Sequence, residues 1–125
     1  MMDQPSIREL VEAVREFLEK RAMPELTGHT AFHARVAANA LGIVARELEL
    51  GDGAADEEKE RLTALLGHDG SLEELNRELC RIIREGEIEL AKPELLTHLE
   101  RTVRDKIAID QPNYSGLKIA KERDS

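Results

Sequence analysis

The stretch Thr30–Leu50, TAFHARVAANALGIVARELEL, decides the fold. No other segment combines such length with so continuous an apolar surface, and at about 100° per residue its apolar side chains cover most of a helix. The positions expected to be buried are Ala37, Leu41, Val44 and Leu48 on one line, Val36, Ala40 and Ile43 beside it, and Ala34, Ala38 and Ala45 on the other flank. The sequence therefore predicts a central, largely buried helix around which the other elements pack.

Capping and breaking signals divide the rest of the chain into four further helices. Capping-box patterns open at Ser6 and Ser71, and Pro93 suits the first turn of a helix. The expected helices are 6–21, 30–50, 56–66, 71–86 and 93–109, with a break at Leu50-Gly51-Asp52-Gly53. The prediction is an all-α, single-domain bundle of about five helices over residues 1–115, followed by a frayed, charged tail over 116–125.

Composition excludes several functional classes. The 125 residues fit one domain, and the formal net charge of -8, from 26 acidic and 18 basic residues, argues against nucleic-acid binding. The single cysteine, Cys80, forms no intrachain disulfide, so a reducing cytoplasm fits. No signal-peptide pattern and no run of 18 apolar residues indicates export or membrane insertion.

A narrow polar seam interrupts the apolar surface of the central helix. Its members are Arg35, Asn39, Gly42 and Arg46, spaced by four, three and four residues. Asn and Gly both disfavour a helix interior, and Gly costs about 1 kcal/mol relative to Ala, a cost that usually serves close packing or a polar contact. Two interpretations remain open at this point: a solvated stripe, or a surface that faces a partner or ligand.

A second polar group gathers where the fifth helix ends. It comprises Asp105, Lys106, Asp110 and Tyr114, which together offer hydrogen-bond donors and acceptors at one end of the bundle. A docking or phosphate-recognition corner is one interpretation. The other is structural, because cations are favoured in the last turn of a helix and the stem of Lys106 can lie on apolar surface.

No residue pattern predicts catalysis or a cofactor. His29 and His33 lie one helical turn apart, a spacing that can bind a metal, but no third ligand is evident nearby. The chain has no nucleophile elbow, P-loop, dinucleotide glycine motif or Ser/His/Asp set. The expectation is a protein without metal, cofactor or catalytic residues.

Two runs carry a resemblance to a known family. AFHARVAANALGIVARELELG (31–51) and TVRDKIAIDQPNY (102–114) resemble the signatures of a small family of helical bacterial proteins of unknown function. Its members are encoded beside aminoglycoside-phosphotransferase-like kinases and acyl-CoA dehydrogenase-like enzymes. The resemblance implies a small companion subunit of a kinase that phosphorylates a 4-hydroxyacyl-CoA. It picks out His33, Arg35, Asn39, Asp105, Lys106, Asp110, Pro112 and Tyr114.

The resulting expectation is a non-catalytic accessory subunit of such a kinase, with His33, Arg35, Asn39, Arg46, Asp105, Lys106, Asp110 and Tyr114 facing partner or ligand. One alternative is a module that binds acyl-CoA or phosphate through Arg35, Arg46 or Lys106, and a weaker one is a metal-dependent enzyme using His29 and His33. A homodimer is also possible, because the Ala34-Ala38-Ala45 flank would admit a second helix from a twin chain or from the kinase.

Overall fold

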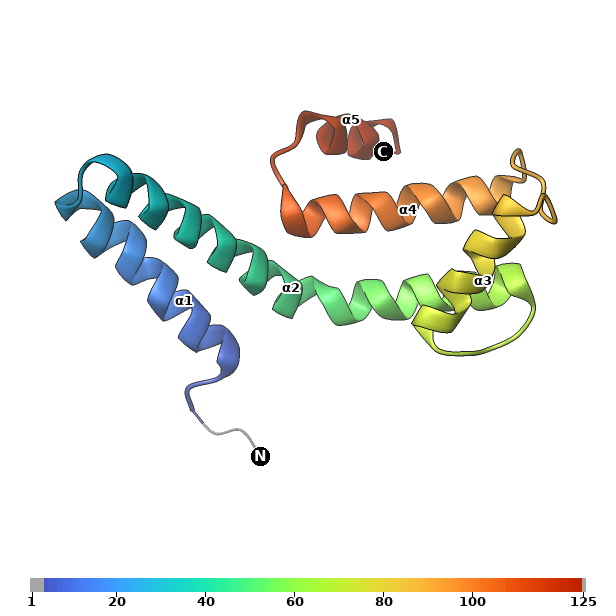
Figure 1. Ribbon diagram of the computed structural model, residues 1–125, viewed down its shortest axis with the longest axis horizontal. Coiled ribbons are helices and arrows are strands. Elements are labelled where there is room, and N and C mark those ends of the chain that lie inside the picture. The colour runs from blue at the N-terminus through green and yellow to red at the C-terminus, as the bar shows by residue number, and fades with distance from the viewer. Residues whose placement is uncertain (1–3, 125) are drawn as a thin grey trace. The chain divides into compact units, whose positions relative to one another are not determined.

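A computed structural model describes residues 4–124, which form five α-helices and no strand, so the all-α prediction is confirmed (Figure 1). The helices are α1 (Ile7–Phe17), α2 (Gly28–Leu66), α3 (Leu72–Arg84), α4 (Pro93–Asp110) and α5 (Ser115–Arg123). The chain divides into two compact units, unit 1 (Met1–Leu50) and unit 2 (Gly51–Ser125). None of the helices within 4–124 is long and apolar enough to span a membrane.

The predicted helix starts are set by their side-chain caps. Ser6 Oγ accepts a hydrogen bond from the Glu9 amide at 3.1 Å, and the Glu9 carboxylate accepts one from the Ser6 amide at 3.2 Å. Ser71 Oγ caps α3 by accepting from the Glu74 amide at 3.1 Å. Pro93 is the first residue of α4, where its missing N–H costs nothing.

The predicted break at Gly51–Gly53 is wrong, because α2 runs without interruption from Gly28 to Leu66. Glycine lowers helix stability by about 1 kcal/mol but ends a helix reliably only where it adopts a positive φ. Gly67 does so, with φ 81°, and its amide donates to the Thr63 carbonyl at 2.9 Å. The expected helices 30–50 and 56–66 are therefore one helix that contributes to both units.

In unit 1, α1 lies antiparallel to the first part of α2. Arg8 reaches Glu49 at 3.3 Å, and the guanidinium of Arg15 lies beside Gly42. The buried side chains of this part of α2 are Ala34, Ala38 and Ala45, which let the two backbones approach closely.

The predicted burial of the Thr30–Leu50 stretch is right for Ala34, Ala38 and Ala45 and wrong for its larger apolar side chains. Val44 and Leu48, on the line expected to be most buried, are 43% and 44% exposed. The alanine flank, expected to receive a helix from another chain, packs on α1 of the same chain. Within residues 4–50, α1 is the only α-helix beside this part of α2, so the face with small side chains is covered and the bulkier one is not.

The hydrophobic core lies in unit 2. Four leucines from three helices form it: Leu62 of α2, Leu75 and Leu79 of α3, and Leu95 of α4. Half-buried side chains surround them, namely Leu66, Leu72, Ile82, Ile83 and Ile88. The most deeply buried side chain of α2, that of Leu62, thus lies in its second half, within the expected helix 56–66.

The end of the chain differs from the frayed tail expected beyond residue 115. It forms α5, whose Leu117 is buried and whose ion pairs join Arg123 to Glu100 and Asp124 to Arg104 of α4. A buried leucine and two ion pairs tie a charged terminal segment to its neighbour, which local sequence composition does not reveal.

Candidate functional site

The polar seam lies on the open side of the α1–α2 pair. Arg35, Asn39 and Arg46 each follow a buried alanine (Ala34, Ala38, Ala45) by one residue, so they are rotated by about 100° from the line of contact with α1. Arg35 and Asn39 are exposed and Arg46 is half-buried. The seam therefore borders the helix–helix contact: Arg35 and Asn39 are open to solvent, whereas Gly42 is buried in that contact.

Gly42 makes room for two guanidinium groups. A Cβ at this position would lie 3.2 Å from Arg46 Nη1 and 3.5 Å from Arg15 Cζ. Arg15 is paired in turn with Glu19 at 3.1 Å and with Glu12 at 3.8 Å. Because Gly42 has no side chain, the guanidinium groups of Arg46 and Arg15 come together there, and Arg15 is paired with the carboxylates of Glu12 and Glu19. Positive and negative groups therefore alternate on this surface.

His33 lies on the other side of α2 from this seam. It precedes Ala34, and its ring makes an edge contact with Phe32, with ring centroids 5.6 Å apart. Across residues 4–124, no three His, Cys, Asp or Glu side chains are grouped as metal ligands.

The second predicted group lies at the end of α4 in unit 2. Lys106 and Asp110 are exposed, and the ring of Tyr114 covers Gly116, where a Cβ would come within 2.4 Å of Tyr114 Cε2. Asp105 is half-buried, and its Oδ2 is buried without a hydrogen-bond partner among the described residues. Buried carboxylate oxygens are normally bonded, so Asp105 is the unusual member of the group.

A buried polar cluster in unit 2 was missed from the sequence. Arg61 of α2 donates from Nε to Nδ1 of His98 at 3.1 Å and from Nη2 to Oγ1 of Thr102 at 3.2 Å. His98 is only 2% exposed. Burial first, and the charge of Arg61 second, lower the pKa of His98, while Glu58 opposes them. His98 is therefore a neutral acceptor for a cationic donor.

The sequence would have revealed this cluster if polar residues had been counted along with apolar ones in the helical spacing of α4. The inward line of α4 is Leu95, His98, Thr102, Asp105 and Ile109, spaced by three and four residues. Apolar residues alone predict a buried arc of Leu95, Leu96, Leu99, Val103 and Ile107 for this helix, but Leu96, Leu99 and Val103 are 53%, 41% and 53% exposed. That arc is therefore wrong for these three positions, because a hydrogen-bonded histidine and threonine occupy the contact with α2.

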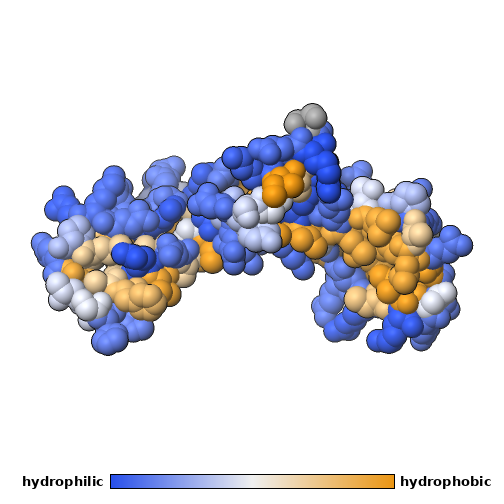
Figure 2. All heavy atoms as spheres, turned by 90° about the horizontal axis from the view of Figure 1, so that it is seen from above, coloured by the Kyte–Doolittle hydropathy of each residue, from blue (hydrophilic) through white to orange (hydrophobic). Residues whose placement is uncertain are grey.

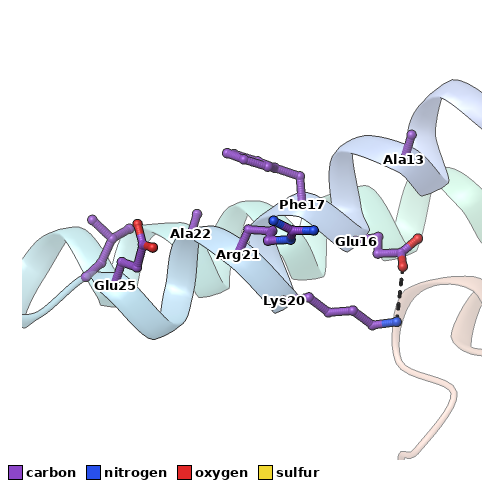
Figure 3. A pocket seen from close by; sticks show the side chains of 8 residues that line it. Ala13, Glu16, Phe17, Lys20, Arg21, Ala22 and Glu25 are labelled. Carbon is purple, nitrogen blue, oxygen red and sulfur yellow. Dashed lines mark hydrogen bonds and ion pairs between the residues drawn. The ribbon is translucent and has the colours of Figure 1, made fainter.

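The surface depressions described here are open and shallow. One, on α1 and the turns after it, is shown in Figure 3, where Lys20 pairs with Glu16 at 3.1 Å. Another, in unit 2, brings Arg61 and Lys92 beside an apolar wall of Ala64 and Leu65. In the first, Lys20 is paired with Glu16, whereas the second combines Lys92 with Glu94 and with Arg61, which already donates to His98 and Thr102.

Comparison with known proteins places the chain in a family. The model of a domain of unknown function, DUF6285, matches residues 24–114, well over half of the chain. The chain belongs to the DUF6285 family. No curated protein and no solved structure matches it.

All eight predicted site residues lie within the matched part of this DUF6285 protein, four in unit 1 and four in unit 2. Those in unit 1 are His33, Arg35, Asn39 and Arg46, and those in unit 2 are Asp105, Lys106, Asp110 and Tyr114. The match begins at Pro24, after α1, and ends at Tyr114, before α5. The matched region thus contains the polar seam, the buried Arg61–His98 cluster and the polar end of α4, whose groups can donate to and accept from a partner surface.

Proposed function

We propose that this DUF6285 protein is a non-catalytic accessory subunit of a phosphotransferase-like kinase that acts on hydroxyacyl-CoA. The proposal starts from the runs 31–51 and 102–114, which resemble proteins encoded beside such kinases. In this proposal the kinase carries out the phosphoryl transfer, and the DUF6285 chain supplies a binding surface.

The observation that carries the proposal is the exposed polar seam on α2. The side chains of Arg35 and Asn39 have no hydrogen-bond or ion-pair partner within residues 4–124, although an Asn inside a helix costs stability. At Gly42 the seam meets the guanidinium of Arg15, which pairs with Glu12 and Glu19. Such a mixed, open surface matches a folded partner better than an enclosed ligand, because protein interfaces pair extended complementary charges.

Reconstitution with the kinase tests the proposal. The rate of ATP-dependent phosphorylation of a 4-hydroxyacyl-CoA should be low with kinase alone and should rise when the DUF6285 protein is added. The Arg35→Ala/Asn39→Ala double variant should bind the kinase at least about tenfold more weakly. Lys20→Ala, which also removes one exposed cation from unit 1, should bind like the natural protein. A kinase that reaches its full rate alone would overturn the proposal.

The groove in unit 2 favours a second candidate, a module that binds acyl-CoA. Lys92 would contact a phosphate group there, beside an Arg61 that is already bonded to His98 and Thr102, while Leu65 contacts an apolar chain. Titration calorimetry of the isolated protein with CoA and acyl-CoA distinguishes the candidates. Saturable binding that Lys92→Ala weakens and Lys118→Ala leaves unchanged would favour the module. Absence of heat with either ligand would dismiss it.

A further inference from the structure

Helix α1 leaves its own apolar line uncovered. It contains no buried residue, and Ile7, Leu10, Val14 and Phe17 are 60%, 50%, 51% and 58% exposed. These four positions are spaced by three, four and three residues, the spacing of a helix that packs against another along a seam. The contact with α2 does not use this line.

The uncovered lines of α1 and α2 lie on the same side of unit 1. On α1, Arg8 and Arg15 reach α2, and Val11 and Arg15 are its two half-buried residues. Each of these three follows a member of the uncovered line by one position. On α2, Ala37 and Val44 likewise precede the buried Ala38 and Ala45 by one position. The two helices are antiparallel, so equal rotations from their line of contact point to the same side of the pair.

Together these lines form one surface, which we call the apolar face: Ile7, Leu10, Val14 and Phe17 of α1 with Ala37, Leu41, Val44 and Leu48 of α2. On the face of this unit seen in Figure 2, apolar side chains lie next to one another between charged ones. No charged residue belongs to the apolar face. The polar seam, one position after the buried alanines, lies on the opposite side of α2.

The size of the apolar face is that of a dimer interface. Six of its side chains are 43–60% exposed, those of Ile7, Leu10, Val14, Phe17, Val44 and Leu48. They present roughly 500–600 Å² per chain and roughly 1,000–1,200 Å² in a symmetric pair, at the lower bound for a stable interface. This area is at the upper end of the largest apolar patch on a typical monomer, about 300–600 Å², and such patches are often functional.

A second copy of the chain is the occupant that the charges favour. Unit 1 contains eight acidic and six basic residues, whereas unit 2 contains eighteen and twelve, so six of the eight net negative charges lie outside unit 1. Two copies of unit 1 can therefore approach with little repulsion. A two-fold axis would bring the apolar lines of α1 and α2 in one copy against the same lines in the other, as in a four-helix bundle.

We infer that the protein forms a homodimer in which the apolar faces of two copies of unit 1 pack together as a four-helix bundle. The inference does not depend on the proposed kinase, because the polar seam on the other side of α2 stays open in the dimer. Each α1 gains in the dimer the burial that it lacks within one chain.

Sedimentation equilibrium and light scattering of the full chain test the inference. The expected mass is twice the 14.0 kDa of one chain, with a Kd of about 1 µM or tighter. Leu10→Glu/Val14→Glu should yield a monomer, since it places two charges in the interface. Val103→Glu, at a 53% exposed position of α4 in unit 2, should remain a dimer.

A milder variant distinguishes a weakened dimer from a misfolded chain. Leu10→Ala adds no charge and should raise the dimer Kd by about tenfold or more while circular dichroism retains the helical signal of unit 2. A natural protein that is monomeric far above 1 µM would overturn the inference. So would a dimer that persists unchanged in Leu10→Glu/Val14→Glu, because its interface would lie elsewhere.

Discussion

At the scale of single residues, His98 is the side chain whose surroundings most constrain its chemistry. Its ring is buried between α2 and α4 and accepts a hydrogen bond from Arg61 at 3.1 Å. Protonation would remove this acceptor and place two cations side by side, with only Glu58 to compensate. The pKa of the imidazole is therefore lower in the folded protein than in a free histidine.

This environment predicts that acid destabilises unit 2 through His98. Folding lowers the pKa of His98, so the unfolded chain binds more protons below about pH 6.5 and the free energy of unfolding falls as the pH drops from that value. In His98→Gln, which keeps an acceptor for Arg61, this part of the pH dependence should be absent. Urea unfolding at a series of pH values between neutrality and about pH 5 measures it.

His68 provides an internal control of opposite sign. The backbone carbonyl of Asp69 first, and Glu78 at 2.6 Å second, raise the pKa of His68. Its contribution to stability is present below about pH 6.5 and is lost as the pH rises through the higher pKa of the folded state. His68→Gln should therefore steepen the loss of stability in acid. An identical pH dependence in both variants would contradict both assignments.

Leu62 should be the most sensitive apolar position of α2. It is fully buried among Leu75, Leu79 and Leu95, so Leu62→Ala should lower the free energy of unfolding by about 2–5 kcal/mol. Leu96→Ala, at a 53% exposed position of α4, should cost less than about 1 kcal/mol. Chemical denaturation compares the two. Equal losses would show that the core lies elsewhere.

At the scale of elements, α2 shows how one helix serves two purposes along its length. Its first part offers an alanine line to α1, an apolar line on one side and a polar seam on the other. Its second part buries Leu62 and aims Arg61 at α4. The same helical periodicity therefore builds a contact surface in unit 1 and a core in unit 2.

Replacing Gly53 in α2 and Gly67 just after it by alanine should change the free energy of unfolding in opposite directions. Gly53 is helical with nothing within 4 Å of an added Cβ, so Gly53→Ala should raise the free energy of unfolding by about 0.5–1 kcal/mol. Gly67 ends the helix with φ 81°, so Gly67→Ala should lower it by about 1–2 kcal/mol. Thermal unfolding of the two variants measures the difference. A loss of stability in Gly53→Ala would show that α2 is interrupted near residue 53.

At the scale of the whole molecule, the two proposed interfaces differ in physical character, and salt should separate them. Raising the salt concentration from about 0.1 M to about 1 M shortens the Debye length from about 10 Å to about 3 Å. Binding of the kinase to the seam containing Arg35 should weaken, whereas dimerisation through the apolar face should persist or strengthen. Light scattering and a binding titration at both salt concentrations test this. Parallel weakening of both interactions would show that charges also hold the dimer together.

Local chemistry made several parts of the fold predictable. The caps at Ser6 and Ser71 and the proline at position 93 act through atoms a few residues away, so the sequence located the starts of α1, α3 and α4. The polar seam was also visible, because a guanidinium, an amide and a glycine repeat at helical spacing. The Arg61–His98 contact joins residues 37 positions apart and has no local signature.

The sequence by itself determined that this DUF6285 protein is helical, where most helices begin, and which side chains share a face of α2. The tertiary structure alone decided which face is buried, because periodicity defines faces without naming the neighbour that covers them. In unit 1 that neighbour is α1, which takes the alanine line and leaves the larger apolar residues exposed. It also decided that α2 continues through Gly51 and Gly53, since two glycines only weaken a helix that its neighbours support.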